Sequence, residues 1–348
     1  MDVFRSTGRK RETYNVEVKH SLLWECALGI AAITNSRLLE TLEKPASFWK
    51  EAKVSFSTEL LEQLEFVEKN NTWKALLQLL HEHDCTELQS FVSYITHLPE
   101  NELKFICIPY SGSMFQETRK KAASGDTDAV NKLKHQLKEN PFFPEYIEFI
   151  CKIDPGKLKN HLIAVMTAWY KEFIEPNADA LLSYLENDTE AKQKMKGKMG
   201  PEEFVEWATG GITYLPEPSV HNVLLIPHYI YRPWNVEADV EGTKVFYYPV
   251  ANESISPGDR YTPNYFLVQK YKALGDEARL KIVKLLSEKS YSLQEMTGKL
   301  ELGKSTVHHH LKILRSARIV ESKNAKYSLK QHSIASLPEE LEQYLSKQ

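Results

Sequence analysis

The sequence contains little cysteine, with 4 such residues among 348, namely Cys26, Cys85, Cys107 and Cys151. All four lie in the first half of the chain, and no two of them form a C-x-x-C pair. Isolated thiols of this kind favour a reduced interior over a disulfide framework or a redox motif. We therefore predict four free cysteines and no soft-metal site, because such a site needs thiolates close together.

Long hydrophobic runs are also missing. The longest apolar stretch, residues 22–33, is too short to span a bilayer and contains Glu25. The opening residues, MDVFRSTGRKRETY, are basic, but no apolar segment of the kind found in signal peptides follows them. We expect a cytoplasmic protein with no membrane partner.

Catalytic signatures are absent as well, since the chain has no G-x-S-x-G, no P-loop and no G-x-G-x-x-G. The segment HEHDC, residues 81–85, has the residue types of a metallohydrolase. Its histidines stand only two positions apart, however, so on a helix they diverge instead of sharing a face. A polar helix end explains this segment better than a catalytic site. We predict that the protein is not an enzyme and holds no cofactor or metal.

The length and composition predict several domains in an ordinary soluble protein. A chain of 348 residues exceeds what one core usually supports, and 42% hydrophobic with 26% charged residues is typical of globular proteins. The net charge of −3 conceals an asymmetry: residues 264–348 contain 15 Lys and Arg against 9 Asp and Glu, whereas residues 1–263 contain 29 against 38. The basic C-terminal end is a separate electrostatic unit, suited to an anionic partner.

The first two hundred residues have the apolar spacing of helices, with apolar positions three and four residues apart. Thr86 with Gln89 resembles a capping box, and Asp154 before Pro155 marks another helix start. The predicted helices cover residues 21–33, 57–69, 71–83, 86–98, 126–140, 154–173 and 177–195.

Short β-branched and aromatic runs replace this pattern at residues 221–231, 235–239 and 243–250. With a turn at Glu241-Gly242, they predict a small antiparallel sheet. The expected fold is therefore mainly α, in three parts. We predict a helical N-terminal module at 1–211, a β-rich connector at 212–262 and a helix-turn-helix domain with a wing at 263–348.

The C-terminal part has the pattern of a winged helix-turn-helix. Ser292 and Glu295 form a capping box for one helix, and Ser305 is the expected N-cap of the next, "STVHHHLKILRSA". Two strands around a turn at Asn324-Ala325 follow as the wing. The face left outside is rich in donors and free of acidic residues, which suits phosphates and base edges. The candidate DNA-binding residues are Lys304, Ser305, Thr306, His308, His309, Lys312 and Arg315, with Lys323 and Lys326 in the wing.

The order "ALGDEARLKIVKLL", "SLQEMTGKLELGKSTVHHHLKIL" and "ARIVE", followed by a hairpin, resembles the ArsR-type winged-helix transcription regulators. The resemblance runs from Ala273 to Val320 without a gap. It makes the helix from Ser305 the recognition helix and places His310 at the histidine of the family pattern. His308 stands where a serine is usual, and Glu301 where a turn glycine is usual.

The same resemblance implies a homodimer, because dimers of this family use their first and last helices. The residues concerned are Leu267, Tyr271, Leu337, Leu341, Tyr344 and Leu345. Metal-sensing members carry cysteines in the helix that begins here after Ser292, but this helix has none, and the last helix offers glutamates without a histidine among them.

Together these patterns predict a bacterial, dimeric repressor that binds a double-stranded DNA operator and is controlled through its N-terminal module. The length of the N-terminal module implies a further task, either sensing a small molecule or binding a protein effector. The alternative is an enzyme or scaffold protein that uses the winged helix only as a protein-contact surface.

Overall fold

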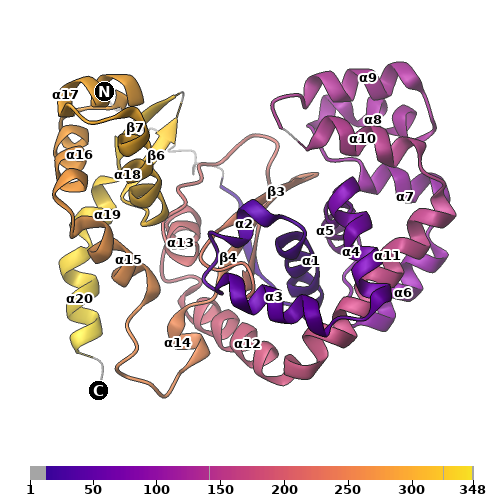
Figure 1. Cartoon of the computed structure of the whole chain (residues 1–348), viewed down its shortest axis with the longest axis horizontal. Coiled ribbons are helices and arrows are strands. Elements are labelled where there is room, and N and C mark those ends of the chain that lie inside the picture. The colour runs from indigo at the N-terminus through magenta and orange to yellow at the C-terminus, as the bar shows by residue number, and fades with distance from the viewer. Residues whose placement is uncertain (1–12, 141, 324, 347–348) are drawn as a thin grey trace, which may run out of the picture.

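The computed structural model describes residues 13–140, 142–323 and 325–346. Figure 1 shows a large helical part in indigo to pink, a small sheet beside it, and a C-terminal domain in orange to yellow on the other side of α13 (Pro201–Ala208). The fold is mainly α, with a helical N-terminal part, a few strands and a winged helix-turn-helix at the C-terminal end, as predicted.

The N-terminal part consists mostly of helices of two to five turns. Besides α13, they are α1 (Leu22–Ile33), α2 (Ser36–Leu39), α3 (Ala46–Ser55), α4 (Thr58–Asn70), α5 (Trp73–Glu82), α6 (Leu88–His97), α7 (Glu100–Cys107), α8 (Gln116–Ala123), α9 (Thr127–Gln136), α10 (Phe143–Lys152), α11 (Pro155–Trp169), α12 (Ala178–Met195) and α14 (Asn252–Ile255). Short turns of other helix types are η1 (Ser113–Phe115), the π-helical η2 (Tyr170–Ile174) and η3 (Glu175–Asn177).

Helices α11 and α6 both begin with a side-chain cap, one at the predicted residue and one a residue later. Asp154 caps α11 as predicted, because its Oδ1 accepts the backbone N–H of Lys157 at 2.8 Å. The capping box predicted at Thr86 is wrong. The N-cap of α6 is Glu87, whose N–H donates to Ser90 Oγ at 3.3 Å, so the same type of box forms one residue later.

The larger sheet has the strand order β1-β2-β4-β3, formed by β1 (Asn15–Val18), β2 (Asn222–His228), β4 (Thr243–Pro249) and β3 (Val236–Val240). Strands β3 and β4 are antiparallel around the Glu241-Gly242 turn, as expected. The prediction of a wholly antiparallel sheet is wrong, because β2 pairs in parallel with both β4 and β1. The short β1, which the sequence pattern did not reveal, pairs Asn15 with Asn222.

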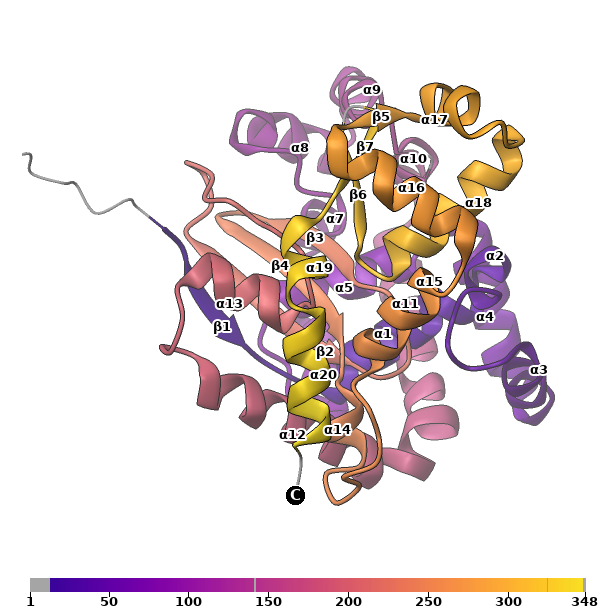
Figure 2. The ribbon, with the colours of Figure 1, turned by 90° about the vertical axis from the view of Figure 1, so that its left-hand side faces the viewer.

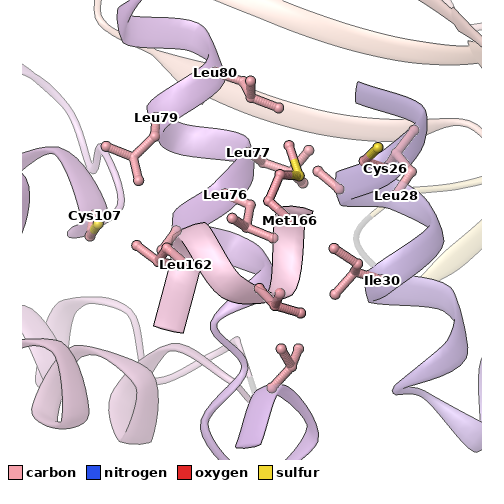
Figure 3. Close-up of a cluster of buried hydrophobic side chains, with 14 of the residues drawn as sticks. Cys26, Leu28, Ile30, Leu76, Leu77, Leu79, Leu80, Cys107, Leu162 and Met166 are labelled. Atoms are coloured by element: carbon pink, nitrogen blue, oxygen red, sulfur yellow. The ribbon is translucent and has the colours of Figure 1, made fainter. Parts of the chain in front are cut away.

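Both faces of this sheet are buried, which explains its parallel core. On one face, Ile226, Val245 and Tyr247 join the main hydrophobic core with the helices. Figure 3 shows the centre of that core, where side chains of α1, α5 and α11 meet. The other face packs against Phe204 and Val205 of α13. Helix α13 is thereby held firmly against the sheet.

A buried carboxylate ties the loop after β2 to the helical part. Glu25 of α1 is 1% exposed, and its carboxylate accepts the backbone N–H groups of Tyr229 and Ile230, the latter at 3.0 Å. Burial raises the pKa of Glu25 to about 7, although these two hydrogen bonds act in the opposite direction. Nearby, Arg232 donates to Glu43 at 2.9 Å and to the carbonyl of Val250 at 2.7 Å.

All four cysteines are free, as predicted, and three of them are buried while Cys151 is partly exposed. Among the described residues, no helix is long and apolar enough to cross a membrane. The three-part division at residues 211 and 262 stays a prediction, although strands β2 and β4 share the core of the helical part.

Two glycines provide a matched test of the packing. A Cβ at Gly29 in α1 would lie 2.8 Å from the ring of Trp169, which is fully buried and stacked on Phe173. We expect Gly29→Ala to lower the free energy of unfolding by about 1–3 kcal/mol, because an overpacked core cannot accommodate the methyl group. Gly298 lies in a helix with open space around it, so Gly298→Ala should raise stability by about 0.5–1 kcal/mol.

Urea unfolding followed by circular dichroism and tryptophan fluorescence measures both changes. If Gly29→Ala proved as stable as the parent protein, the close packing of α1 on Trp169 would be incorrect.

Candidate nucleic-acid interface

Three helices with a tight turn form the centre of the C-terminal domain: α16 (Glu277–Glu288), α17 (Leu293–Leu300) and α18 (Lys304–Ser316). Val307, Leu311 and Leu314 of α18 are buried, which is the stripe expected from their spacing. They pack with Met296 of α17 and with residues of α16 in one core. This packing leaves the opposite side of α18 in solvent.

Helix α17 begins with the predicted capping box. The Ser292 N–H donates to Glu295 Oε2 at 2.7 Å, and Ser292 Oγ accepts the N–H of Glu295 at 3.3 Å. The hydrogen bonds from Ser292 lower the pKa of Glu295. The box thus positions α17 and, through it, the turn that leads to α18.

The turn between α17 and α18 differs from the expectation at one point. Ser305 was predicted to cap α18, but the N-cap is Gly303 and the helix starts at Lys304. Glu301 adopts the left-handed conformation with φ of 55° and ψ of 31°. This is the backbone geometry that glycine provides without strain, which accounts for the turn glycine usual at this place in the ArsR-type pattern.

The outer side of α18 carries the predicted contact residues. All seven candidates in this helix are exposed, and the helix contains no acidic residue; they are Lys304, Ser305, Thr306, His308, His309, Lys312 and Arg315. Unpaired backbone N–H groups of the first turn and the helix dipole add positive potential at the N-terminal end of α18. The face therefore offers donors and cations suited to an anionic, grooved surface.

The three consecutive histidines point in different directions. His308 and His309 are exposed, whereas the His310 side chain is 13% exposed. His310 Nδ1 lies 3.9 Å from Oδ1 of Asp276, the N-cap of α16. His310 therefore lies at the edge of the packed face, near the start of α16.

A three-stranded sheet, ordered β5-β7-β6, forms the wing beside α18. Its strands are β5 (Tyr291–Ser292), β6 (Val320–Lys323) and β7 (Lys326–Leu329). Lys326 is exposed and pairs with Lys323 in the backbone register. The side chain of Lys323, like the predicted turn residue Asn324, lies outside what the structure describes. Figure 2 shows the C-terminal domain from its outer side, with the wing next to α16 and α18.

Comparison with known proteins agrees with this geometry. The family described as "Bacterial regulatory protein, arsR family" matches residues 276–322, which span α16, α17, α18 and most of β6. The C-terminal part of the chain contains an ArsR-type helix-turn-helix. A curated relative, "Transcriptional repressor SmtB homolog" of Synechocystis sp., is 27% identical over 85 residues, which are 23% of this chain and 64% of that protein. The chain thus spans less than two thirds of the length of this relative, and no solved structure matches.

Two lysines of the ArsR-type domain were not found by sequence reasoning. Lys289 and Lys299 lie 5.2 and 5.7 Å from the centre of the Tyr291 ring, and both are exposed. Because Tyr291 of β5 pairs with Tyr327 of β7, both cations lie beside the sheet of the wing. The sequence could not predict this position of the two lysines, because the pairing of residues 291 and 327 leaves no local pattern.

Helices α15 (Tyr265–Leu274) and α20 (Leu337–Leu345), which precede and follow the residues matched by the ArsR family, pack against each other. Lys270 and Glu340 form an ion pair of 2.6 Å between them. The predicted dimer residues differ in exposure: Leu267 and Leu337 are buried, Leu341 and Tyr344 are partly buried, and Tyr271 and Leu345 are 43% and 72% exposed. A short helix, α19 (Gln331–Ala335), precedes α20.

Residues 13–140, 142–323 and 325–346 contain no group of three or more His, Cys, Asp or Glu residues that could hold a metal ion. This holds for the ArsR-type domain as well.

The histidines of the HEHDC segment have separate partners. His81 hydrogen-bonds the Tyr247 hydroxyl at 2.6 Å, and burial lowers the pKa of His81 to about 3. His83 instead stacks on Tyr94, with ring centroids 4.6 Å apart. The two histidines diverge, as their spacing predicts.

The left-handed residue in the turn leads to a stability prediction. A side chain in this conformation costs about 1–2 kcal/mol relative to the right-handed one, whereas glycine adopts it freely. After subtracting the larger entropy of unfolded glycine, Glu301→Gly should raise the free energy of unfolding of the C-terminal domain by about 0.5–1 kcal/mol.

Glu301→Ala is the control, because alanine also has a Cβ and should give no such gain. Chemical denaturation monitored by circular dichroism compares the three proteins. Equal stability of the glycine and alanine variants would mean that the turn is not left-handed.

Proposed function

We propose that the protein is a transcription regulator that binds double-stranded DNA through its ArsR-type domain. The observation that carries this proposal is the exposed face of α18, where seven donor or cationic side chains lie together without a carboxylate. A helix of this kind fits the major groove, with basic residues of the wing on the neighbouring phosphates. We propose the same DNA-contacting role for Lys323 and Lys326 as for the residues of α18.

We further propose that the regulator is a homodimer and a repressor in the cytoplasm of a bacterium. Support for the dimer comes from Tyr271 and Leu345, large apolar side chains that stay exposed on the first and last helices of the domain. The dimer seam would contain these two together with Leu267, Leu337, Leu341 and Tyr344. The repressor assignment follows the printed name of the curated relative.

Control through the N-terminal part is supported by a tight contact behind the recognition helix. Arg318 follows the C-terminal end of α18 by two residues, and its guanidinium lies 3.5 Å from the centre of the Phe266 ring. A Cβ at Gly210, which follows α13, would collide with the Arg318 guanidinium. The Gly211 carbonyl also accepts a hydrogen bond from Lys330. A movement of the sheet together with α13, on binding a small molecule or protein effector, would therefore reach α18 through this contact.

The direct test is retardation of genomic fragments in a native gel, beginning with the DNA upstream of the protein's own gene. We expect a discrete complex that survives excess nonspecific competitor and protects one short site from nuclease. If every retarded complex disappeared with competitor, the winged helix would serve another purpose, such as protein contact.

Lysines in the interface should affect the salt dependence of binding. We expect Lys304→Ala and Lys326→Ala each to weaken binding to all DNA sequences about equally. Each variant should also lower the slope of log K against log salt by about one unit, because one phosphate contact and its released counterion are lost. Filter binding or fluorescence anisotropy over a salt series measures the slope.

The control is Lys53→Ala, which changes an exposed lysine of α3, far from α18 in the sequence, and should leave the slope unchanged. Slopes equal to that of the parent protein for both interface variants would remove these lysines from the contact with DNA.

The exposed histidines should determine which operator is preferred. We expect His308→Ala or His309→Ala to relax base preference at one position each, at a cost of about 1–3 kcal/mol for a lost base contact. Selection from random DNA, followed by sequencing, compares the preferred motifs. His332→Ala, which changes a histidine outside α18, is the control; identical motifs for the parent and both α18 variants would show that these residues do not read bases.

A further inference from the structure

A pocket of about 900 Å³ lies between α4, α10 and α11, on the helical part of the molecule. Pockets of about 300–1,000 Å³ hold ligands of the size of drugs or short peptides. The base of the pocket is aromatic, because the rings of Phe66 and Phe149 lie 5.8 Å apart and Phe66 lies 4.3 Å from the His161 ring. Ile153 and Ala164 extend this apolar surface.

His161 makes the base of the pocket rigid and uncharged. Its Nδ1 lies 2.6 Å from Gln63 Oε1, and its Nε2 lies 2.7 Å from the hydroxyl of the buried Thr72. Because the amide oxygen can only accept, the proton is on Nδ1 and the Thr72 hydroxyl donates to Nε2. Burial lowers the pKa of His161 to about 4, so the ring remains neutral at pH 7. Both ring nitrogens are therefore occupied and hold the ring in place.

Positive charge lines one end of the pocket. Helix α10 ends at Lys152, and after a short corner α11 begins at Pro155, so Lys152 and Lys157 are brought to the same end. Lys152 is occupied, because it donates to Glu148 at 2.5 Å while Lys134 donates to the same carboxylate. These two hydrogen bonds lower the pKa of Glu148 to about 2. Within the described residues, Lys157 forms no ion pair and is the available cation at this end.

Negative charge lines the other end. Glu145 precedes Lys152 on α10 by two turns, a rise of about 10 Å. Two contacts show that α4 runs antiparallel to α11. Ser57, just before α4, donates to Glu172, which follows the end of α11, at 2.6 Å. Later in α4, the Phe66 ring contacts His161, which lies earlier in α11. Glu62 therefore lies farther from Lys157 than Phe66 does. Neither Glu62 nor Glu145 forms an ion pair in the part of the chain that the structure describes.

The pocket thus has carboxylates at one end, an ammonium group at the other and aromatic rings between them. We propose that it binds a short apolar peptide with free ends. The peptide's amino group would lie at Glu62 and Glu145, its carboxylate at Lys157, and its side chains on Phe66 and Phe149. The rise of about 10 Å along α10 between Glu145 and Lys152 is about the length of three extended residues, at about 3.3–3.6 Å per residue, and it sets the size of the peptide used as a probe.

The test uses the full chain and tripeptides of sequence Leu-Phe-Leu in isothermal titration calorimetry without DNA. The free tripeptide should bind with a stoichiometry of one, and acetylation of its amino end or amidation of its carboxyl end should each weaken binding about tenfold or more, because a hydrogen bond to a charged group is lost. Since no DNA is present, the result is independent of the proposed operator binding.

Variants then assign each end of the peptide to its partner. The double variant Glu62→Gln with Glu145→Gln should lose the discrimination against the acetylated peptide and keep that against the amidated one. Lys157→Gln should show the opposite pattern. Glu65→Gln, an exposed residue of α4 that does not line the pocket, is the control and should bind like the parent. Circular dichroism checks that each variant is folded.

Absence of saturable binding by the free tripeptide would overturn the proposal. Equal binding of free and blocked peptides would do so as well, as would discrimination that stays unchanged in the pocket variants.

Discussion

The burial of the four-stranded sheet on both faces is the constraint on which the arrangement of this protein depends. One face closes the main core of the helical part, and the other face holds α13 through Phe204 and Val205. Because α13 is fixed in this way, the Gly210-Gly211 turn that follows it has a defined position. The C-terminal domain rests on that turn through Arg318 and Lys330. A strand pairing in one part of the chain thus sets the position of the recognition helix in another.

Helix α18 is held at both ends by residues in the left-handed conformation. Glu301 before the helix has φ of 55°, and Arg318 after it has φ of 60°. Between them, the buried stripe of α18 orients the exposed face. The orientation of that face is therefore determined by the backbone at its ends and by the core beneath it, and the exposed side chains are free to meet a partner.

Local patterns in the sequence were sufficient to predict most helices, the caps at Asp154 and Ser292, and the exposed face of α18. Each of these features depends on neighbours within a few residues along the chain. Contacts between distant segments could not be predicted in this way. The four residues of β1 make a strand only because β2 lies beside them, and Lys289 and Lys299 approach the wing only through the pairing of β5 with β7. The expected cap at Ser305 was wrong because a hydroxyl residue inside the first turn has the same local pattern as one just before it.

The pairing of β1 with β2 also affects the synthesis of the chain. Asn15 pairs with Asn222, so β1 leaves the ribosome roughly two hundred residues before its partner does. At about 5–20 residues per second, this delay lasts about 10–40 seconds. During that time Val16 and Val18 have no strand beside them, and the helical part lacks the residues of β2 and β4 that complete its core. The C-terminal domain is translated after α13 and after all four strands of the larger sheet, so it emerges when the surface that will support it has been synthesised.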